Sequence, residues 1–242
     1  MKFAVTPANV PVVPLKECGK EAGNEVQFFP VHRIYCVGKN YIAHIREMGS
    51  TPDRDPPCFF MKPADAVTTK EEVPYPPVTK NYHYETELVV AIGKDGFEIS
   101  EAKANDYIFG YAVGFDMTRR DLQMSSGGLG HPWDTGKGFD YSAPISPIVP
   151  VSETGFLESG RILLKVNGEI RQDADLSELI WKIPEIIAEL SNLYSLKAGD
   201  LIFTGTPAGV GSVVAGDRLE ASIDKVGMLS ITIVDGKLKN SG

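Results

Sequence analysis

The sequence predicts a β-rich α+β protein, and three observations support this class. Short runs of apolar and β-branched residues recur along the chain, and many are bounded by prolines and glycines, of which there are 17 and 24. Segments with helical periodicity are few and short. Strands and helices do not alternate regularly, which excludes a doubly wound parallel sheet. We therefore expect a mixed β-sheet protein with a few short helices.

The first half of the chain is expected to contain an N-terminal arm followed by the start of a single domain. Residues 1–30 are rich in proline and then in glycine and glutamate, which predicts an extended arm or a small hairpin before a domain over residues 31–242. In the helix expected next, Asn40 is a candidate N-cap and Gly49 a candidate terminator. The expected elements are strands at 32–38, 58–63, 84–93 and 109–118, and helices at 40–49, 99–108 and 119–127.

The second half contains two clear local signals. The dipeptide Asn167-Gly168 predicts a two-residue hairpin turn within 161–172. Pro184 interrupts the apolar periodicity of 176–194 and predicts that the main helix begins there. The other expected elements are an extended segment at 142–150, a strand within 198–207 and two strands within 216–234.

The composition is that of an ordinary globular protein. The 242 residues are 43% hydrophobic and 23% charged, with a net charge of −8 and no basic patch typical of nucleic-acid binding. Prolines interrupt the apolar N-terminal residues, so they form neither a signal peptide nor a membrane span. Three cysteines without C-x-x-C spacing indicate neither a disulfide framework nor a zinc site. These features predict a cytoplasmic protein without nucleic-acid or membrane partners.

Three acidic residues stand at the ends of apolar strands. Glu85 and Glu87 are two residues apart, so their side chains share one face of a strand, and Asp116 closes the strand predicted at 109–118. Buried carboxylates repel one another, and a divalent cation relieves that repulsion. An all-oxygen ligand set suits Mg²⁺, Mn²⁺ or Ca²⁺ rather than zinc. The alternatives are that the glutamates are solvated and that Asp116 is a turn residue.

Two further sets of residues are candidates for catalysis. His44 and Glu47 are three residues apart on the predicted helix, where they form either a surface salt bridge or a general base oriented by a carboxylate. Lys137 lies between two glycines, and it is either a solvated lysine or a group that approaches a ligand closely. The glycine-rich stretch 205–212 lacks the lysine of a phosphate-binding loop, so it gives no nucleotide signature.

Four stretches of the sequence together resemble the fumarylacetoacetate hydrolase family. They are VGKNYIAHIREMG (37–49), HYETELVVAIG (83–93), GYAVGFDMTRRDLQ (110–123) and GTPAGVG (205–211). The first is similar to the acylpyruvate hydrolase branch, and the resemblance covers about residues 31–234. It implies a rolled mixed β-sandwich that forms a homodimer.

The resemblance also implies roles for nine residues and for a metal ion. By this resemblance, the metal is bound by Glu85, Glu87 and Asp116, and water is activated by His44 and Glu47. The oxyanion is stabilised by Lys137, and the substrate is contacted by Arg120, Gln123 and Thr206. The implied cofactor is Mg²⁺ or Mn²⁺, with Ca²⁺ able to replace them in crystals.

The implied reaction is the metal-dependent hydrolysis of an acylpyruvate, a 1,3-diketo acid. The expected substrate is fumarylpyruvate of gentisate catabolism, which yields fumarate and pyruvate. Within the family, the alternatives are decarboxylation or tautomerisation of oxaloacetate and isomerisation or decarboxylation of hydroxymuconate-type acids. A further alternative is a non-catalytic, metal-dependent binding protein, against which the presence of His44, Glu47 and Lys137 argues.

Overall fold

Two packed β-sheets form the centre of the computed structural model, which describes residues 4–6, 8–16, 26–49 and 55–236. The larger sheet has six strands in the order β12-β9-β8-β15-β3-β4, and most of its pairings are antiparallel. Its strands are β3 (Ile34–Gly38), β4 (Cys58–Lys62), β8 (Thr86–Ile92), β9 (Ile108–Phe115), β12 (Val149–Pro150) and β15 (Leu201–Phe203). The expected β-rich mixed architecture is confirmed.

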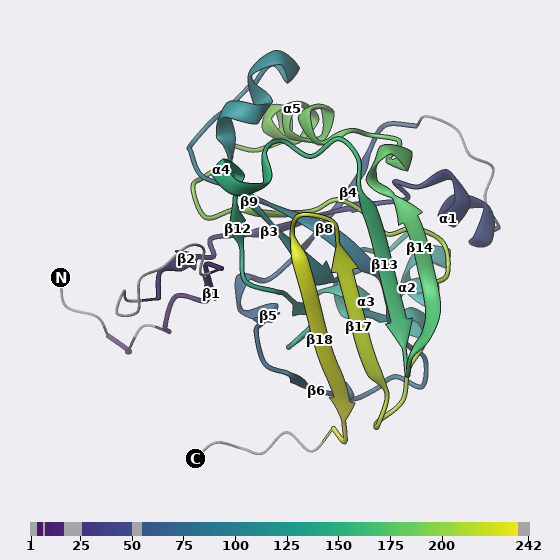
Figure 1. Ribbon diagram of the computed structural model, residues 1–242. Helices are drawn as coiled ribbons and strands as arrows, with labels where there is room; N and C mark the ends of the chain where they lie inside the picture. The colour runs from purple at the N-terminus through teal and green to yellow at the C-terminus, as the bar shows by residue number, and fades with distance from the viewer. Residues whose placement is uncertain (1–3, 7, 17–25, 50–54, 237–242) are drawn as a thin grey trace.

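A five-stranded sheet lies across the first, with the order β14-β13-β17-β18-β6 (Figure 1). Its strands are β6 (Glu72–Pro74), β13 (Arg161–Val166), β14 (Glu169–Asp175), β17 (Arg218–Ile223) and β18 (Gly227–Val234). Apolar side chains of both sheets, including Leu88, Val113, Leu164 and Ile231, are buried in one cluster. The two sheets therefore form a sandwich over a common core.

Strand β8 is buried on both of its faces. Leu88, Val90 and Ile92 belong to the core between the sheets, whereas Val89 and Ala91 belong to a second apolar cluster. This double burial explains why the strand reads as a continuous apolar run rather than an alternating one. The alternation along a strand also places Glu87 on the face of Val89 and Ala91, away from the five-stranded sheet.

The strand predicted at 84–93 is divided at Glu85. Residues before it form β7 (Tyr82–Tyr84), which pairs with β10 (Thr118–Arg119) and β16 (Gly211–Ser212) in a separate sheet. Residues after it form β8 of the large sheet. Glu85 thus lies where the chain passes from one sheet to the other, and its carbonyl accepts a hydrogen bond of 2.8 Å from the amide of Asp116.

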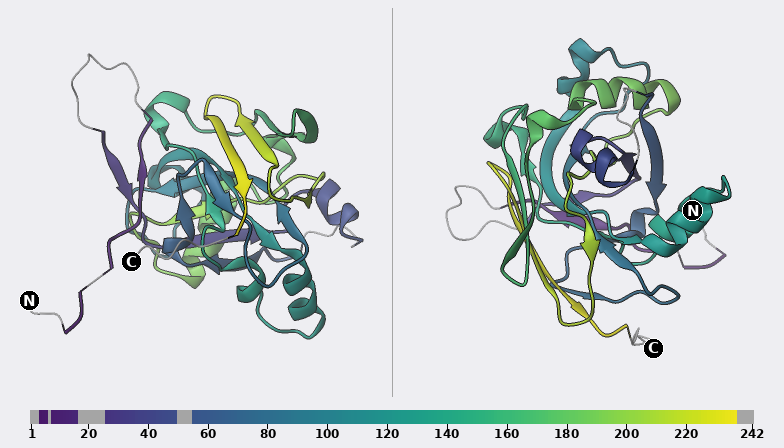
Figure 2. Two further views of the ribbon diagram at one scale, coloured as in Figure 1. Left: turned by 90° about the horizontal axis from the view of Figure 1, so that it is seen from below. Right: turned by 90° about the vertical axis from the view of Figure 1, so that its right-hand side faces the viewer.

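The helices are short, and several lie at the ends of the sandwich. They are α1 (Ile42–Glu47), α2 (Arg120–Gly128), α3 (Asp134–Lys137), α4 (Val151–Thr154) and α5 (Ile183–Leu193), with the 3₁₀ helices η1 (Ala64–Ala66), η2 (Glu101–Tyr107) and η3 (Leu176–Glu178). In the right-hand view of Figure 2, α1 lies over the open end of the rolled sheets.

One local prediction for the helices is confirmed and one is wrong. The helix expected at 99–108 is present as the 3₁₀ helix η2, and the amide of Ile99 just before it donates a hydrogen bond to the hydroxyl of Ser191 in α5. Asn40 does not cap α1, because its side-chain amide donates to the carbonyls of Thr204 and Trp181. Tertiary hydrogen bonds have replaced the local cap.

Other local predictions are confirmed. Gly49 follows α1 with a φ of 75°, and Asn167 and Gly168 have φ of 52° and 84°, as the predicted hairpin turn requires. Pro184 lies in the first turn of α5.

Within the predicted arm, β1 (Val12–Pro14) and β2 (Phe28–Pro30) form an antiparallel pair. Their residues Val13 and Phe29 are buried in the second apolar cluster. Cys36 and Cys58 are free thiols, whereas Cys18 lies outside the described residues. Among the described helices, none has the length and apolar character needed to cross a membrane.

Candidate active site

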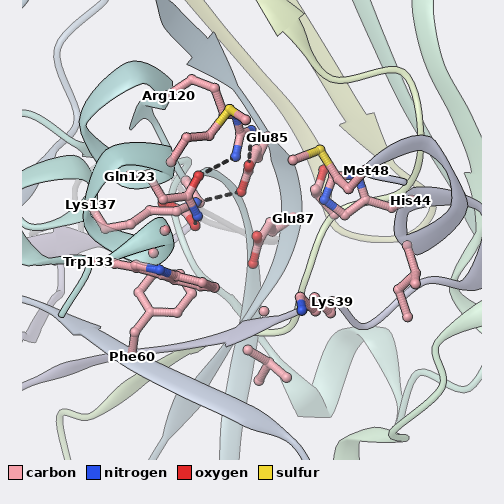
Figure 3. Close-up of a pocket in the computed structure, with 18 residues that line it drawn as sticks. Lys39, His44, Met48, Phe60, Glu85, Glu87, Arg120, Gln123, Trp133 and Lys137 are labelled. Atoms are coloured by element: carbon pink, nitrogen blue, oxygen red, sulfur yellow. Dashed lines mark hydrogen bonds and ion pairs between the residues drawn. The ribbon is translucent and has the colours of Figure 1, made fainter. Parts of the chain in front are cut away.

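A pocket of about 410 Å³ opens beside α1, at the end of the sandwich (Figure 3). Eight of the nine residues predicted for the site line it, and the ninth, Glu47, contacts one of the eight. They come from α1, the β7–β8 corner, the end of β9, α2, α3 and the loop after β15. The fold therefore brings together segments that are far apart in the sequence.

The three carboxylates converge as the sequence predicted. Glu85, Glu87 and Asp116 each offer an oxygen within 4.8 Å of the others, and their exposed fractions are 5%, 2% and 1%. The antiparallel pairing of β8 and β9 produces this arrangement, because it places Thr86 opposite Phe115 and so brings the two strand ends together. The alternative of solvated glutamates is wrong for this structure.

Buried cations surround two of these carboxylates. Lys137 Nζ donates to Glu85 Oε2 at 2.7 Å, to Asp116 Oδ2 at 2.6 Å and to the hydroxyl of Thr118 at 2.7 Å. Arg120 donates to Glu85 Oε1 and to Gln123 Oε1. An ammonium has three N–H groups, so the hydrogen bonds of Lys137 are all in use. The alternative of a solvated Lys137 is wrong, since the residue is only 2% exposed.

A close approach between helices positions Lys137. A Cβ added at Gly136 would lie 2.7 Å from the backbone nitrogen of Gln123. Glycine therefore allows α3 to pack directly on α2, which places Lys137 and Gln123 on the same side of the pocket (Figure 3).

The charges of this cluster perturb one another. Burial raises the pKa of Glu85, but the nearby charges of Lys137 and Arg120 outweigh burial and lower it below its usual range. Burial lowers the pKa of Lys137, but Asp116 and Glu85 outweigh burial and raise it. Burial is also the main cause that raises the pKa of Glu87 well above its usual value, and the charges of Asp116 and Glu85 add to it.

Glu87 differs from the other two carboxylates in its partners. Its Oε2 accepts a hydrogen bond of 2.8 Å from the amide of Gly205, and no lysine or arginine among the described residues forms an ion pair with it. Gly205 has a φ of 103°, and a Cβ there would lie 2.7 Å from the Cβ of Asn40. Glycine is therefore required for the loop to present its amide to Glu87.

The carboxylate cluster fits a divalent cation on two grounds. Three buried carboxylates offer only hard oxygen ligands, which suit Mg²⁺ and Mn²⁺. Glu87 lacks a cationic partner within the described part of the chain, so a cation beside it would remove the cost that its raised pKa reports. Glu85, Glu87 and Asp116 are the residues that would hold the ion.

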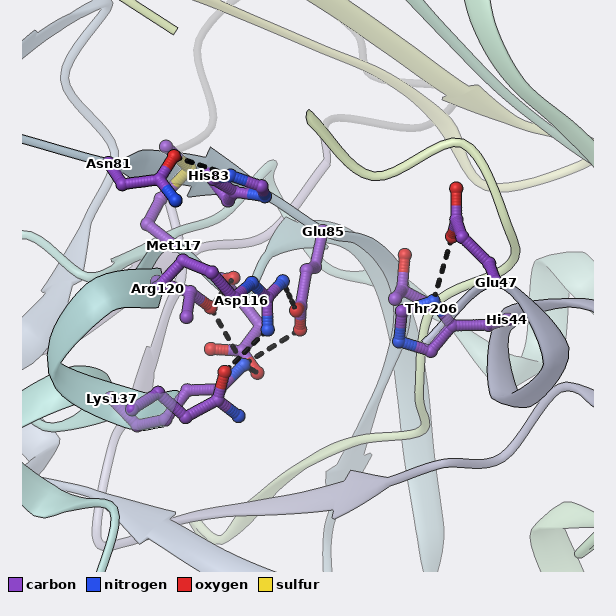
Figure 4. Close-up of polar contacts among 12 residues, drawn as sticks. His44, Glu47, Asn81, His83, Glu85, Asp116, Met117, Arg120, Lys137 and Thr206 are labelled. Carbon is purple, nitrogen blue, oxygen red and sulfur yellow. Dashed lines mark hydrogen bonds and ion pairs between the residues drawn. The ribbon is translucent and has the colours of Figure 1, made fainter. Parts of the chain in front are cut away.

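His44 and Glu47 lie across the pocket from Arg120 and Lys137 (Figure 4). His44 Nδ1 is 3.2 Å from Glu47 Oε2, while Glu47 Oε1 accepts a hydrogen bond of 3.0 Å from the amide of Gly209. His44 is only 7% exposed, so the pair is not a simple surface salt bridge. Glu47 instead joins α1 to the loop that follows β15.

Thr206 lines the pocket from that same loop. Its hydroxyl accepts a hydrogen bond of 2.8 Å from the side chain of Gln172, which also accepts one of 3.0 Å from the amide of Thr86. Gln172 is completely buried and thereby connects the loop to the start of β8. Its position at 172 on the outer strand β14 gave no sequence signal of this role.

Sequence reasoning missed several residues of the site. Lys62 Nζ lies 2.8 Å from Asp116 Oδ1 as an ion pair without hydrogen-bond geometry, and it donates to the carbonyls of Met117 and Lys137. A lysine closing the apolar segment CFFMK was the signal, because a buried lysine requires carboxylate partners. Lys39, Phe60 and Trp133 also line the pocket, and no role was predicted for them, although Lys39 lies within the stretch 37–49.

Comparison with known proteins identifies the family. The family model described as fumarylacetoacetate (FAA) hydrolase C-terminal matches residues 33–234. A fumarylpyruvate hydrolase of a Ralstonia species is 49% identical over 175 residues, which cover 72% of this chain and 91% of the relative. The mouse mitochondrial oxaloacetate tautomerase FAHD1 is 44% identical over 194 residues, covering 80% of this chain and 87% of the relative.

A solved structure agrees with the fold and with a metal site. The fumarylpyruvate hydrolase of Pseudomonas aeruginosa, in complex with Mn²⁺ and pyruvate, has a TM-score of 0.91 and 47% identity. The match covers 97% of this chain and 100% of that chain. With the buried triad, this similarity supports a divalent metal site in this protein. The chain belongs to the fumarylacetoacetate hydrolase family, and it is an enzyme that hydrolyses carbon–carbon bonds.

Proposed function

We propose that the protein hydrolyses an acylpyruvate and that fumarylpyruvate is its substrate. The observation that carries this proposal is the arrangement of three groups around one pocket, namely a buried carboxylate triad, the cations Arg120 and Lys137, and the His44–Glu47 pair. Figure 4 shows that this pair lies on the opposite side from the two cations. The two fumarylpyruvate hydrolases that resemble this chain at 49% and 47% identity support the choice of substrate.

The metal end of the pocket would hold the pyruvate part of the substrate. The proposed cofactor is Mg²⁺ or Mn²⁺, held by Glu85, Glu87 and Asp116. When bound, the ion supplies a Lewis acid that polarises the 2-oxo acid and stabilises the charge of the leaving enolate. Arg120 and Gln123 orient the substrate from one side of the pocket, because a guanidinium is suited to hydrogen bonding with a carboxylate.

The reaction requires a base and a donor on opposite sides of the acyl carbonyl. His44 takes a proton from water, and Glu47 holds the imidazole in position. The water oxygen adds to the acyl carbonyl carbon, and Lys137 donates a hydrogen bond to the oxygen that becomes negative. The bond from that carbon to C3 of the pyruvate part then breaks. Its electron pair goes to C3, which takes up a proton to give pyruvate, and the acyl part leaves as fumarate.

The structure places a condition on the role of Lys137. Each N–H of its ammonium already has an acceptor in Glu85, Asp116 or Thr118. Lys137 must therefore give up one of these bonds before it donates to the oxyanion. With a cation held by Glu85 and Asp116, their oxygens would serve as its ligands, and Lys137 would then be free to release one of these bonds.

A second candidate function is the tautomerisation or decarboxylation of oxaloacetate. The 44% identity to mouse oxaloacetate tautomerase FAHD1 favours it. Acylpyruvate hydrolysis and these reactions of oxaloacetate both require a 2-oxo acid bound at the carboxylate triad. Only the hydrolysis also requires an attacking water. The non-catalytic alternative is wrong, because the chain belongs to an enzyme family.

The test follows the near-UV absorbance of fumarylpyruvate with Mn²⁺-loaded protein. The variant His44→Ala should lower kcat by about 100-fold or more, as expected for loss of a general base, while Mn²⁺ binding persists. The variant Glu85→Ala and thorough chelation should each abolish hydrolysis by removing the ion. The variant His131→Ala is the matched control, because His131 is exposed and outside this pocket.

The contrary outcomes separate the candidates. Full hydrolysis by His44→Ala would remove this histidine from the chemistry, and full activity after chelation would remove the metal. Turnover of oxaloacetate without any turnover of acylpyruvates would favour the second candidate.

Five further points remain predictions. They are the homodimer, the cytoplasmic location, the gentisate pathway, the division between arm and domain, and a small 2-oxo acid as the partner.

A further inference from the structure

Lys39 differs from the other cations that line the pocket. Arg120 and Lys137 are bound to carboxylates of the triad. Lys39, by contrast, makes no ion pair or hydrogen bond with any residue in the described part of the chain, although it lines the same pocket. Its charge is therefore available to a ligand.

Lys39 also has a fixed position at the base of its side chain. The residue before it, Gly38, pairs with Cys58 at the end of β3, and the residue after it is Asn40, which is completely buried and hydrogen-bonded to Thr204 and Trp181. Lys39 itself has a φ of 58°, a left-handed conformation that is unfavourable for a residue with a Cβ. The chain on both sides holds Lys39 in place despite that cost.

Lys39 lies apart from the other cations of the pocket and close to an apolar wall. In Figure 3, Lys39 lies on the far side of Glu87 from Arg120, whereas the rings of Phe60 and Trp133 lie on the side of Lys137. These rings are 5.6 Å apart between centroids and form an apolar wall. A Cβ added at Gly38 would lie 3.4 Å from the ring of Trp133, so Lys39 begins directly beside that wall.

The charges of the pocket balance a substrate with two carboxylates. Three carboxylates and three permanent cations line the pocket, and Glu47 and Lys62, which contact His44 and Asp116, add one charge of each sign, so the sum is zero when His44 is left aside. A bound divalent ion raises this sum to +2, equal and opposite to the charge of a dianion. Without Lys39 the sum would be +1, which matches an acylpyruvate that carries only the 2-oxo acid carboxylate.

We propose that Lys39 binds the terminal carboxylate of the acyl group and so selects acylpyruvates that end in a carboxylate over those that end in a methyl group. This inference rests on the proposed function, and it adds the residue that determines acyl specificity. The rings of Phe60 and Trp133, which meet edge to face, offer apolar contact to the unsaturated chain between the carbonyl and that carboxylate.

The first test compares fumarylpyruvate with acetylpyruvate, which lacks the second carboxylate. In Lys39→Met, the ratio of kcat/KM for fumarylpyruvate to that for acetylpyruvate should fall about tenfold, mainly through KM. Lys39→Arg should recover most of the ratio, since it restores the charge. Met and Lys face the same backbone cost at a left-handed φ, so the substitution changes the charge without changing that cost. Lys94→Met, at an exposed lysine away from the pocket, is the control that leaves the ratio unchanged.

The second test measures binding without turnover, so it holds even if the protein hydrolyses neither acylpyruvate. Calorimetry of the Mn²⁺-loaded protein compares 2-oxoheptanedioate with 2-oxoheptanoate, which differ only in the terminal carboxylate. The wild type should bind the diacid about tenfold more tightly, and Lys39→Met should bind both equally. Absence of acylpyruvate turnover together with this binding difference would overturn only the proposed reaction.

Three results would overturn the assignment of Lys39. One is an equal loss for both substrates in Lys39→Met, which would show that the residue acts only on the structure around α1. Another is an unchanged ratio in that variant. The third is equal binding of the two seven-carbon acids by the wild type, because the second carboxylate would then have no partner in the pocket.

Discussion

At the scale of single residues, the site is a dense cluster of buried charges. Glu85 and Asp116 are stabilised by Lys137, Arg120 and Lys62, whereas Glu87 receives only the amide of Gly205 within the described part of the chain. A buried carboxylate without a cationic partner raises the free energy of the folded state. The charge of Glu87 thus favours metal binding but destabilises the folded state of the metal-free protein.

Replacing Glu87 by glutamine should have opposite effects on the free and the metal-loaded protein. The pKa of Glu87 is raised in the folded state, so above its unfolded pKa of about 4.5 its charged form destabilises the fold. At pH 7, Glu87→Gln should therefore raise the melting temperature of the metal-free protein by about 2–4 °C for each kcal/mol gained. The same variant should lose most of its Mn²⁺ affinity, because a neutral amide replaces a charged ligand.

Differential scanning calorimetry and Mn²⁺ titration measure these two effects. Glu101→Gln is the matched control, since Glu101 is exposed in η2 and does not line the pocket, and it should change neither quantity. A lower melting temperature of metal-free Glu87→Gln would contradict the account of Glu87 as a buried carboxylate whose charge destabilises the folded state.

At the scale of elements, α1 is positioned by contacts outside itself. It has only six residues, too few for a helix to be stable alone, and no side chain caps its start. Asn40 holds its beginning against Thr204 and Trp181, and Glu47 holds its end against Gly209. The loop after β15 therefore determines where His44 lies relative to the carboxylates.

Removing the contact at the end of α1 should loosen this helix selectively. In Glu47→Ala, amide hydrogen exchange in α1 should be faster by about fivefold or more, because a hydrogen bond to a charged group, worth about 1.5–3 kcal/mol, is lost. Exchange in α5 should not change. Mass spectrometry after deuterium labelling measures both helices in one experiment.

The variant Glu47→Ala also tests the catalytic pair. Its kcat for fumarylpyruvate should fall, since Glu47 holds the imidazole of His44, and the amides of α1 should lose protection from hydrogen exchange at the same time. Glu158→Ala, at an exposed glutamate in the connection after α4, is the control. Unchanged exchange in α1 would mean that Glu47 does not anchor the helix, and the role of α1 in positioning His44 would have to rest on Asn40 alone.

At the scale of the whole molecule, the carboxylate triad couples metal binding to folding. Its ligands come from the β7–β8 corner, from β8 and from the end of β9, and their convergence requires both neighbouring sheets to be formed. An ion that binds this arrangement and not the unfolded chain stabilises the folded state by mass action.

Mn²⁺ should accordingly raise the melting temperature of the wild type. At 100 times the dissociation constant, the expected stabilisation is about 2.7 kcal/mol, which corresponds to about 5–10 °C for a chain of this length. Chelation should reverse the shift. A shift of equal size in Glu87→Gln would place the stabilising ion at a different site.

Local sequence determined those features that depend on neighbouring residues. The Asn167-Gly168 turn, the end of α1 at Gly49 and the shared strand face of Glu85 and Glu87 follow from backbone geometry and from the twofold period of a strand. Asp116 joined them as the acid that closes the next apolar strand, and the motif around it resembles a known family. These signals were sufficient for the fold class, the family and the convergence of the carboxylates.

Tertiary structure alone decided the partners of the buried charges. Lys62 is 54 residues from Asp116, and Asn40 is more than 140 residues from the carbonyls that it contacts, so no local pattern related them. The division of the predicted strand at Glu85 likewise depended on which sheet each half joined. Strand register and sheet packing set these distances through space, and a buried charge is stable only where such contacts supply its partner.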